Sequence, residues 1–134
     1  MGMYTLLQFG ADLKKDTPYE VVNILWYMLG KLEPTPPLPD HPLFQTDRWD
    51  YILCIGDSGY FDEETKHSFN AKVDGGMHLS VTSNLKNYNQ EIQHFIDWIM
   101  PYVDAEEGQL LGSYRYEESR QATEIRYAAP QVSS

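Results

Sequence analysis

Two alternating segments joined by a glycine turn decide the fold: residues 65–83 have the sequence TKHSFNAKVDGGMHLSVTS. Apolar and polar residues alternate on either side of Asp74, Gly75 and Gly76, as in two β-strands that each bury one face. The glycines supply the positive φ angles that a hairpin turn needs. A three-residue turn brings apolar side chains opposite one another and predicts these pairs: Val73 with Met77, Ala71 with Leu79, and Phe69 with Val81.

More strands are expected on both sides of this hairpin. Residues 3–9 form an apolar run followed by turn residues, and residues 109–117 and 122–127 predict a last hairpin around residues 118–121. Residues 49–56 predict another strand, and we expect it to be central because both of its faces are apolar. One face would carry Trp49, Tyr51, Leu53 and Ile55, and the other Ile52 and Cys54.

The first helix is predicted from residue 17 to about residue 31. Thr17 is a suitable N-cap, Pro18 suits the first helical position, and Glu20 can complete a capping box. The spacing of five apolar residues predicts one buried stripe, made of Val21, Ile24, Leu25, Met28 and Leu32.

The second helix is predicted from Tyr88 onward. Asn87 is its expected cap and Gln90 its third helical residue, and Pro101 predicts a stop or a kink near its end. Its expected buried stripe is Ile92, Phe95, Ile96, Ile99 and Val103, with Glu91, Gln93, His94 and Asp97 lying mostly away from it.

These elements predict an α+β fold, an antiparallel sheet of about 5–6 strands with two helices in the order β-α-β-β-β-α-β-β. We expect a single domain over residues 1–127 and a flexible tail over residues 128–134. Residues 33–42 contain five prolines and predict a surface connector inside that domain. A proline-rich ligand motif is the alternative interpretation of this segment.

Charge is the unusual feature of the composition. The 134 residues include 20 Asp and Glu against 10 Lys and Arg, a net charge of -10, which disfavours nucleic acid as a partner. The acidic residues fall in predicted loops and strand ends, which indicates a dispersed acidic rim. Because Cys54 is the single cysteine, and the first residues lack the basic start of a signal peptide, we expect a cytoplasmic protein that spans no membrane.

One motif is typical of catalysis. Residues 56–59, Gly-Asp-Ser-Gly, follow an apolar segment, and this favours a small serine hydrolase in which Ser58 acts with His67 or His78 as the alternative function. The final 40 residues contain no histidine that could serve as the late base of such an enzyme. A turn rich in the residues that turns prefer is the favoured explanation of the motif, so we expect no catalytic residue.

Two Glu-x-x-His motifs, at residues 64–67 and 91–94, have the spacing of metal ligands on a helix. Residues 64–67 begin a predicted strand, in which residues three apart point to opposite faces. The prediction is therefore no metal site and no cofactor.

Ten tyrosines indicate a surface that is partly apolar and partly hydrated, such as a protein interface. Alternation in the last hairpin places several aromatic residues on one sheet face, either as core or as a binding or dimerisation surface. The candidate binding residues are Tyr114, Tyr116 and Tyr127, with Arg115 and Glu117 beside them.

From residue 84 on, a pattern resembles small uncharacterised bacterial proteins over about the last 40% of the chain. It consists of Leu85-Lys86-Asn87-Tyr88, Glu91-Ile92, Phe95, Trp98-Ile99, Pro101-Tyr102, Gly112 and Tyr114-Arg115-Tyr116-Glu117-Glu118. The resemblance implies a folded α+β domain and no catalytic residue. We explain Gly112 by close packing.

Together these features predict a non-enzymatic protein that binds another, basic protein, as an immunity protein or an accessory inhibitor does. A homodimer is the remaining expectation, and neither nucleic acid nor membrane is expected as a partner.

Overall fold

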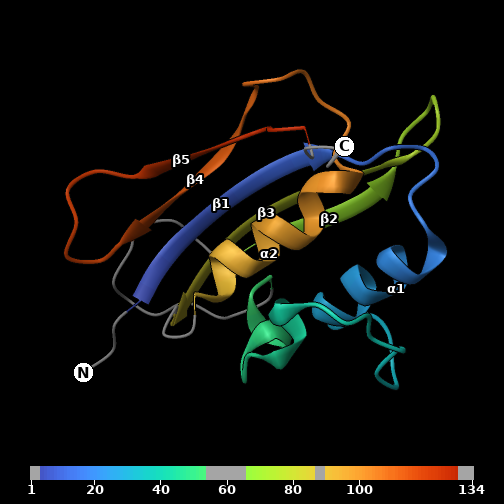
Figure 1. Ribbon diagram of the computed structural model, residues 1–134, viewed down its shortest axis with the longest axis horizontal. Coiled ribbons are helices and arrows are strands. Elements are labelled where there is room, and N and C mark those ends of the chain that lie inside the picture. The colour runs from blue at the N-terminus through green and yellow to red at the C-terminus, as the bar shows by residue number, and fades with distance from the viewer. Residues whose placement is uncertain (1–3, 54–65, 87–89, 130–134) are drawn as a thin grey trace, which may run out of the picture.

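The computed structural model describes residues 4–53, 66–86 and 90–129 (Figure 1). The elements follow in this order: β1 (Tyr4–Asp12), α1 (Tyr19–Met28), the 3-10 helices η1 (Pro42–Gln45) and η2 (Trp49–Tyr51), β2 (Lys66–Ala71), β3 (Met77–Lys86), α2 (Glu91–Ile99), the 3-10 helix η3 (Met100–Tyr102), β4 (Leu110–Tyr116) and β5 (Thr123–Arg126). This confirms the α+β class.

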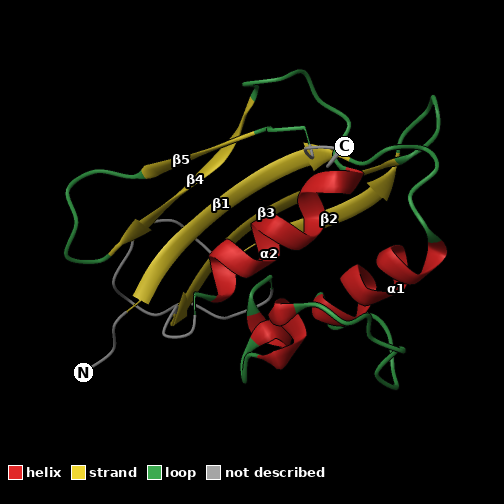
Figure 2. Ribbon diagram, in the orientation of Figure 1, coloured by secondary structure: helices red, strands yellow, loops and turns green. Residues whose placement is uncertain are grey.

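The five strands form one antiparallel sheet in the order β2-β3-β1-β4-β5. Both α-helices lie on the same face of this sheet (Figure 2). Ring contacts fix them there, because Phe95 of α2 meets Phe9 of β1 at 5.7 Å and Trp26 of α1 meets Phe69 of β2 at 4.7 Å. We call this the covered face and the other side the open face.

The β2–β3 hairpin has the predicted faces, but its predicted register was wrong by two residues. Ala71 pairs with Met77, Phe69 with Leu79 and His67 with Val81. The turn has five residues, 72–76, because two consecutive glycines with φ of 96° and 78° widen it and leave Val73 in the turn, fully exposed. A shift by two keeps every side chain on its face, so the core is unaffected.

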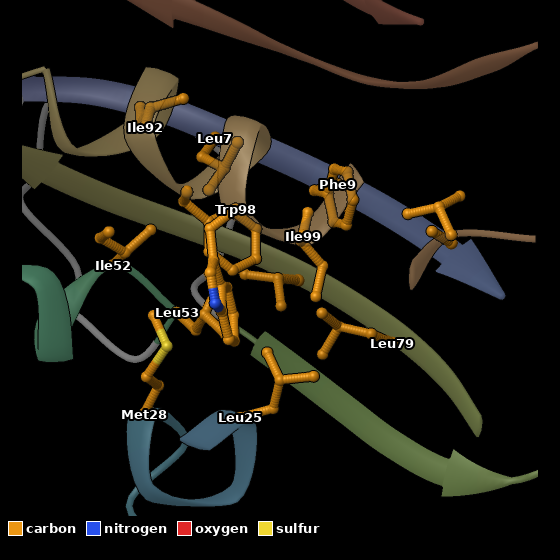
Figure 3. Close-up of a cluster of buried hydrophobic side chains, with 14 of the residues drawn as sticks. Leu7, Phe9, Leu25, Met28, Ile52, Leu53, Leu79, Ile92, Trp98 and Ile99 are labelled. Atoms are coloured by element: carbon orange, nitrogen blue, oxygen red, sulfur yellow. The ribbon is translucent and has the colours of Figure 1, made fainter. Parts of the chain in front are cut away.

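The strand predicted over residues 49–56 was wrong for the part that the structure describes. Residues 49–51 form η2, and residues 54–56 lie outside the described residues. Ile52 and Leu53 are fully buried and lie in the core near α1 and α2 (Figure 3). An irregular segment that is buried on all sides has the same apolar composition as a central strand, which explains the error.

Helix α1 begins later and ends earlier than predicted. The Thr17 hydroxyl donates to the Lys14 carbonyl at 2.6 Å, so it does not cap α1, and Pro18 takes the N-cap position. Gly30, with φ of 76°, follows the last turn. The predicted stripe is buried at Val21, Ile24, Leu25 and Met28, whereas Leu32 lies beyond the helix end.

Helix α2 begins at Glu91, so Gln90 is its N-cap, with φ of 58°, and not its third residue. The predicted cap at residue 87 lies outside the described residues. The stripe is confirmed, with Ile96 only partly buried. Two residues outside the predicted stripe are also buried, namely Trp98 and Glu91, so the prediction that Glu91 lies away from the buried side was wrong. As predicted, Pro101 ends the helix, which tightens into η3.

The last hairpin is confirmed, and β4 pairs with both β1 and β5. Gly112 of β4 pairs with Phe9 of β1, and a Cβ atom there would overlap the Gln8 carbonyl of β1. Close packing therefore explains this glycine, as predicted. Residues 33–41 form the expected irregular connector before η1. No helix in the described part of the chain is long and apolar enough to cross a membrane.

Candidate functional site

A groove with a volume of about 360 Å³ opens between α1, the proline-rich segment and the end of α2. Ligand pockets in proteins have volumes of about 300–1,000 Å³. Three parts of the chain contribute its lining: Pro18, Glu20, Val21 and Ile24 at the start of α1; Pro37, Leu38 and Pro39; and Trp98 and Tyr102. The lining is mainly apolar, and Glu20 is its one charged residue.

The aromatic lining comes from the junction between α2 and η3. Trp98 follows the buried Phe95 by three residues, so both side chains point toward the core side of α2. Pro101 turns the chain into η3 and brings the Tyr102 ring to 6.4 Å from the Trp98 ring. The rings of Trp98 and Tyr102 therefore form one wall of the groove, and both rings also pack against the hydrophobic core.

The proline-rich wall is held at both of its ends. Near its beginning, the Thr35 hydroxyl donates to the Tyr27 hydroxyl of α1 at 2.9 Å. At its end, the His41 Nε2–H donates to the Asp97 carboxylate of α2 at 3.1 Å. His41 Nδ1 accepts the Leu43 backbone N–H at 3.0 Å, which places the ring proton on Nε2. The wall is thus tied to α1 and α2 by side chains that do not line the groove.

A cluster of aromatic rings supports the groove from behind. Phe44 of η1 packs edge-on against Trp98 at 5.4 Å and against Trp49 of η2 at 5.0 Å. Trp49 in turn lies 5.7 Å from Tyr27 of α1. Edge-to-face pairs of this kind stabilise a fixed arrangement of rings. The irregular residues 42–51 therefore have defined contacts with both helices.

Charge is distributed unevenly between the two kinds of segment. The helix-bearing segments, residues 13–53 and 90–108, contain eleven Asp or Glu and four Lys or Arg residues, a net charge of -7. The strand-bearing segments, residues 4–12, 66–86 and 109–129, contain five acidic and six basic residues, a net charge of +1. Within the described part of the chain, most of the negative charge thus lies in the helix-bearing segments. Three of their acidic residues, Asp104, Glu106 and Glu107, lie in the loop before β4, which hydrogen-bonds to Asp12 of β1 and Tyr127 after β5.

A separate polar cluster lies on the open face, where β1 meets the β2–β3 turn. The Asp12 carboxylate accepts a hydrogen bond from His78 Nδ1–H at 2.7 Å and one from the Lys72 ammonium at 3.1 Å. These bonds, His78 first, hold the pKa of Asp12 below its usual value. The same bond to Asp12 raises the pKa of Lys72.

The five predicted binding residues are divided between the two sheet faces. Tyr114 and Tyr116 lie on the covered face and are half-buried, and Tyr114 lines a second cavity of about 280 Å³ beside Ile96. Tyr127 is buried. Arg115, on the open face, donates to the Ser119 carbonyl at 3.3 Å.

Glu117, the fifth of these residues, follows β4, and its backbone N–H donates to the Tyr4 carbonyl of β1 at 3.0 Å. A binding role for these five residues stays a prediction.

The residues of the hydrolase alternative are also separated. His67 pairs with Val81 on the covered face, whereas His78 is on the open face with Asp12, the kind of partner that orients a histidine base. Ser58 lies outside the described residues. Among the residues that the structure describes, no three His, Cys, Asp or Glu side chains form a group that could hold a metal.

The groove was not predicted from the sequence. One signal was present, since Trp98 follows Phe95 by three residues and precedes Tyr102 by four, yet it was left out of the predicted stripe of α2. The other signal was the dense proline segment, which was interpreted as a connector and is also a wall of the groove.

Comparison with known proteins gives no relative. No family model matches the chain, and neither a curated protein nor a solved structure matches it significantly. The resemblance of residues 84–118 to small bacterial proteins therefore assigns no family.

Proposed function

We propose that this protein is a non-enzymatic cytoplasmic module that binds a basic partner protein through its helix-bearing side. The uneven charge carries the proposal, because the helix-bearing segments have a net charge of -7 and the strand-bearing segments of +1. A local excess of negative charge accelerates encounter with a positive partner and orients it. Neutralising a basic toxin or enzyme, as immunity and inhibitor proteins do, is the role that such a surface suits.

Two charge variants of the full chain test the proposal. The groove-side variant combines Glu20→Gln, Asp40→Asn and Asp97→Asn, and the control variant combines Asp74→Asn, Glu118→Gln and Glu124→Gln. All six side chains are exposed, and each variant changes the net charge from -10 to -7.

Each immobilised protein is exposed to lysate of the native host at low salt, and any recovered protein is purified and titrated against all three chains. We expect a basic partner that binds the wild type and the control equally and binds the groove-side variant several-fold more weakly. Equal binding by both variants, or recovery of no partner, would overturn the proposal.

A further inference from the structure

We infer that the groove receives one bulky apolar side chain of the partner protein, flanked in the partner's sequence by Lys or Arg. This inference rests on the proposed function and specifies the partner's chemistry. Interfaces are often centred on such an apolar anchor in a pocket, surrounded by polar contacts.

The apolar part of the inference comes from the lining and its surroundings. Val21, Ile24 and Trp98 are buried core residues that also line the groove. Leu38 on the opposite wall is 39% exposed, and Tyr19, next to the lining residues Pro18 and Glu20, is 75% exposed. Large apolar side chains exposed beside a concave surface are typical of an interaction site.

The basic part of the inference comes from the charges around the groove. Glu20 lines it, Asp97 precedes Trp98 in α2, and Asp40 follows Pro39 of the proline-rich wall. None of the nine lining residues is Lys or Arg. A partner residue next to the anchor would lie close to these carboxylates, so positive charge there is favoured and negative charge is opposed.

The two hydrogen bonds that hold the wall favour a preformed site. The Thr35–Tyr27 and His41–Asp97 contacts fix the proline-rich segment before any partner arrives. Binding then costs little ordering of the wall, because prolines and tied side chains have lost that freedom already. A second copy of this chain is a poor occupant, since it would bring a charge of -10 to the same acidic surface.

The probe is the capped peptide Lys-Lys-Leu-Lys-Lys, titrated at low salt into isotopically labelled full-length protein and followed by NMR. The control peptides replace the central Leu by Ser, or all four Lys by Glu. We expect signals of Glu20, Leu38 and the Trp98 indole to shift with the first peptide. The Ser peptide should bind about tenfold more weakly, which is the loss expected for one unburied leucine side chain.

Two protein variants locate the binding. Leu38→Ser should lower the affinity for the Leu peptide by about threefold to tenfold, because part of the apolar contact is lost. Leu110→Ser is the matched control, since Leu110 is 51% exposed on β4 and lies outside the groove lining. It should leave the affinity unchanged.

Several results would overturn the inference: equal binding of the Leu and Ser peptides, shifts confined to β4 and β5, equal effects of the two variants, or binding of an uncharged apolar compound alone. Concentration-dependent shifts in the free protein would identify a second copy as the occupant and also overturn it. The peptide experiments can fail while binding of the partner protein still depends on Glu20, Asp40 and Asp97. In that case the proposed function is retained, and the inference of an apolar anchor is rejected. If the peptide results are as expected but no basic partner is found, the groove specificity stands and the partner-binding role fails.

Discussion

Leu7 and Gln8 are neighbours on the central strand, yet they face different environments. Leu7 is fully buried on the covered face, among side chains of α2 and β3, whereas Gln8 is exposed on the open face (Figure 3). Further along the two strands, the covered face continues with Val81 and Leu79, and the open face with Ser80 and the Asp12 cluster. Around Leu7, packing against the helices therefore supplies apolar stability. Around Gln8 and Asp12 the open face is polar and exposed, although Leu6 and Leu111 of the same face are also buried.

The largest difference in stability is expected between substitutions of Leu7 and of Gln8. Leu7→Ala removes a side chain that is fully buried in the core, so it should lower the free energy of unfolding by about 2–5 kcal/mol. Gln8→Ala on the same strand should change it by no more than about 0.5 kcal/mol, because an exposed side chain is removed. Urea unfolding of the two variants measures both values. Similar losses for the two would show that the faces contribute alike.

The second comparison uses two glycines on neighbouring strands. Gly112→Ala places a methyl group against the Gln8 carbonyl, so β1 and β4 must separate, at a cost of about 1–3 kcal/mol. In Gly10→Ala the new Cβ would meet its nearest neighbour, the Leu79 carbonyl, at 3.9 Å, an ordinary contact. Gly10→Ala should therefore be neutral or slightly stabilising, because alanine loses less backbone freedom on folding.

Thermal unfolding of the two glycine variants, with circular dichroism to confirm the fold, makes this measurement. A tolerated Gly112→Ala would contradict the close approach of β1 and β4 that the structure describes.

The contrast between the faces was predictable because alternation has a period of two and helical stripes a period of 3.6. These periods assigned Phe69 and Leu79 to one face of the hairpin and Phe95 and Ile99 to the buried side of α2. They did not determine the length of the 72–76 turn, because a register shift of two leaves every face unchanged.

The irregular parts were less predictable for a different reason. Ile52 and Leu53 are buried without belonging to a strand, and periodicity has no signal for such a segment. The Thr17 hydroxyl likewise donates to the Lys14 carbonyl and does not accept a backbone N–H of α1. Both are local hydrogen bonds, and the sequence does not determine which of the two forms.

The groove was beyond sequence reasoning because its walls come from residues 18–24, 37–39 and 98–102. Only the tertiary packing of α1 and α2 brings these segments together. The net charge was visible in the sequence, but its concentration in the helix-bearing segments became meaningful once the groove was known to lie among them.

The smallest effect is expected from the polar contacts of the open face. Hydrogen bonds from His78 and Lys72 hold the pKa of Asp12 below its usual value of 3.8. A carboxyl group whose pKa is lower in the folded than in the unfolded protein stabilises the fold above the unfolded pKa. That contribution is lost as the pH falls through the folded pKa. Because the Asp12 side chain is 39% exposed, solvent screens the contact, and Asp12→Asn should cost only about 0.2–1 kcal/mol at pH 7.

Denaturant unfolding of wild type and Asp12→Asn between pH 7 and pH 2 measures this loss. The difference in stability should shrink as the pH falls below 3.8, because protonated Asp12 and Asn carry the same charge. Asp74→Asn is the control. The Asp74 side chain is 69% exposed and lies 3.7 Å from the Lys72 ammonium, the one member of this cluster that it contacts, so its loss should lower the stability less. A difference that persists unchanged into acid would mean that Asp12 acts through packing, and the open face would then resemble the covered one more closely than its hydrogen bonds imply.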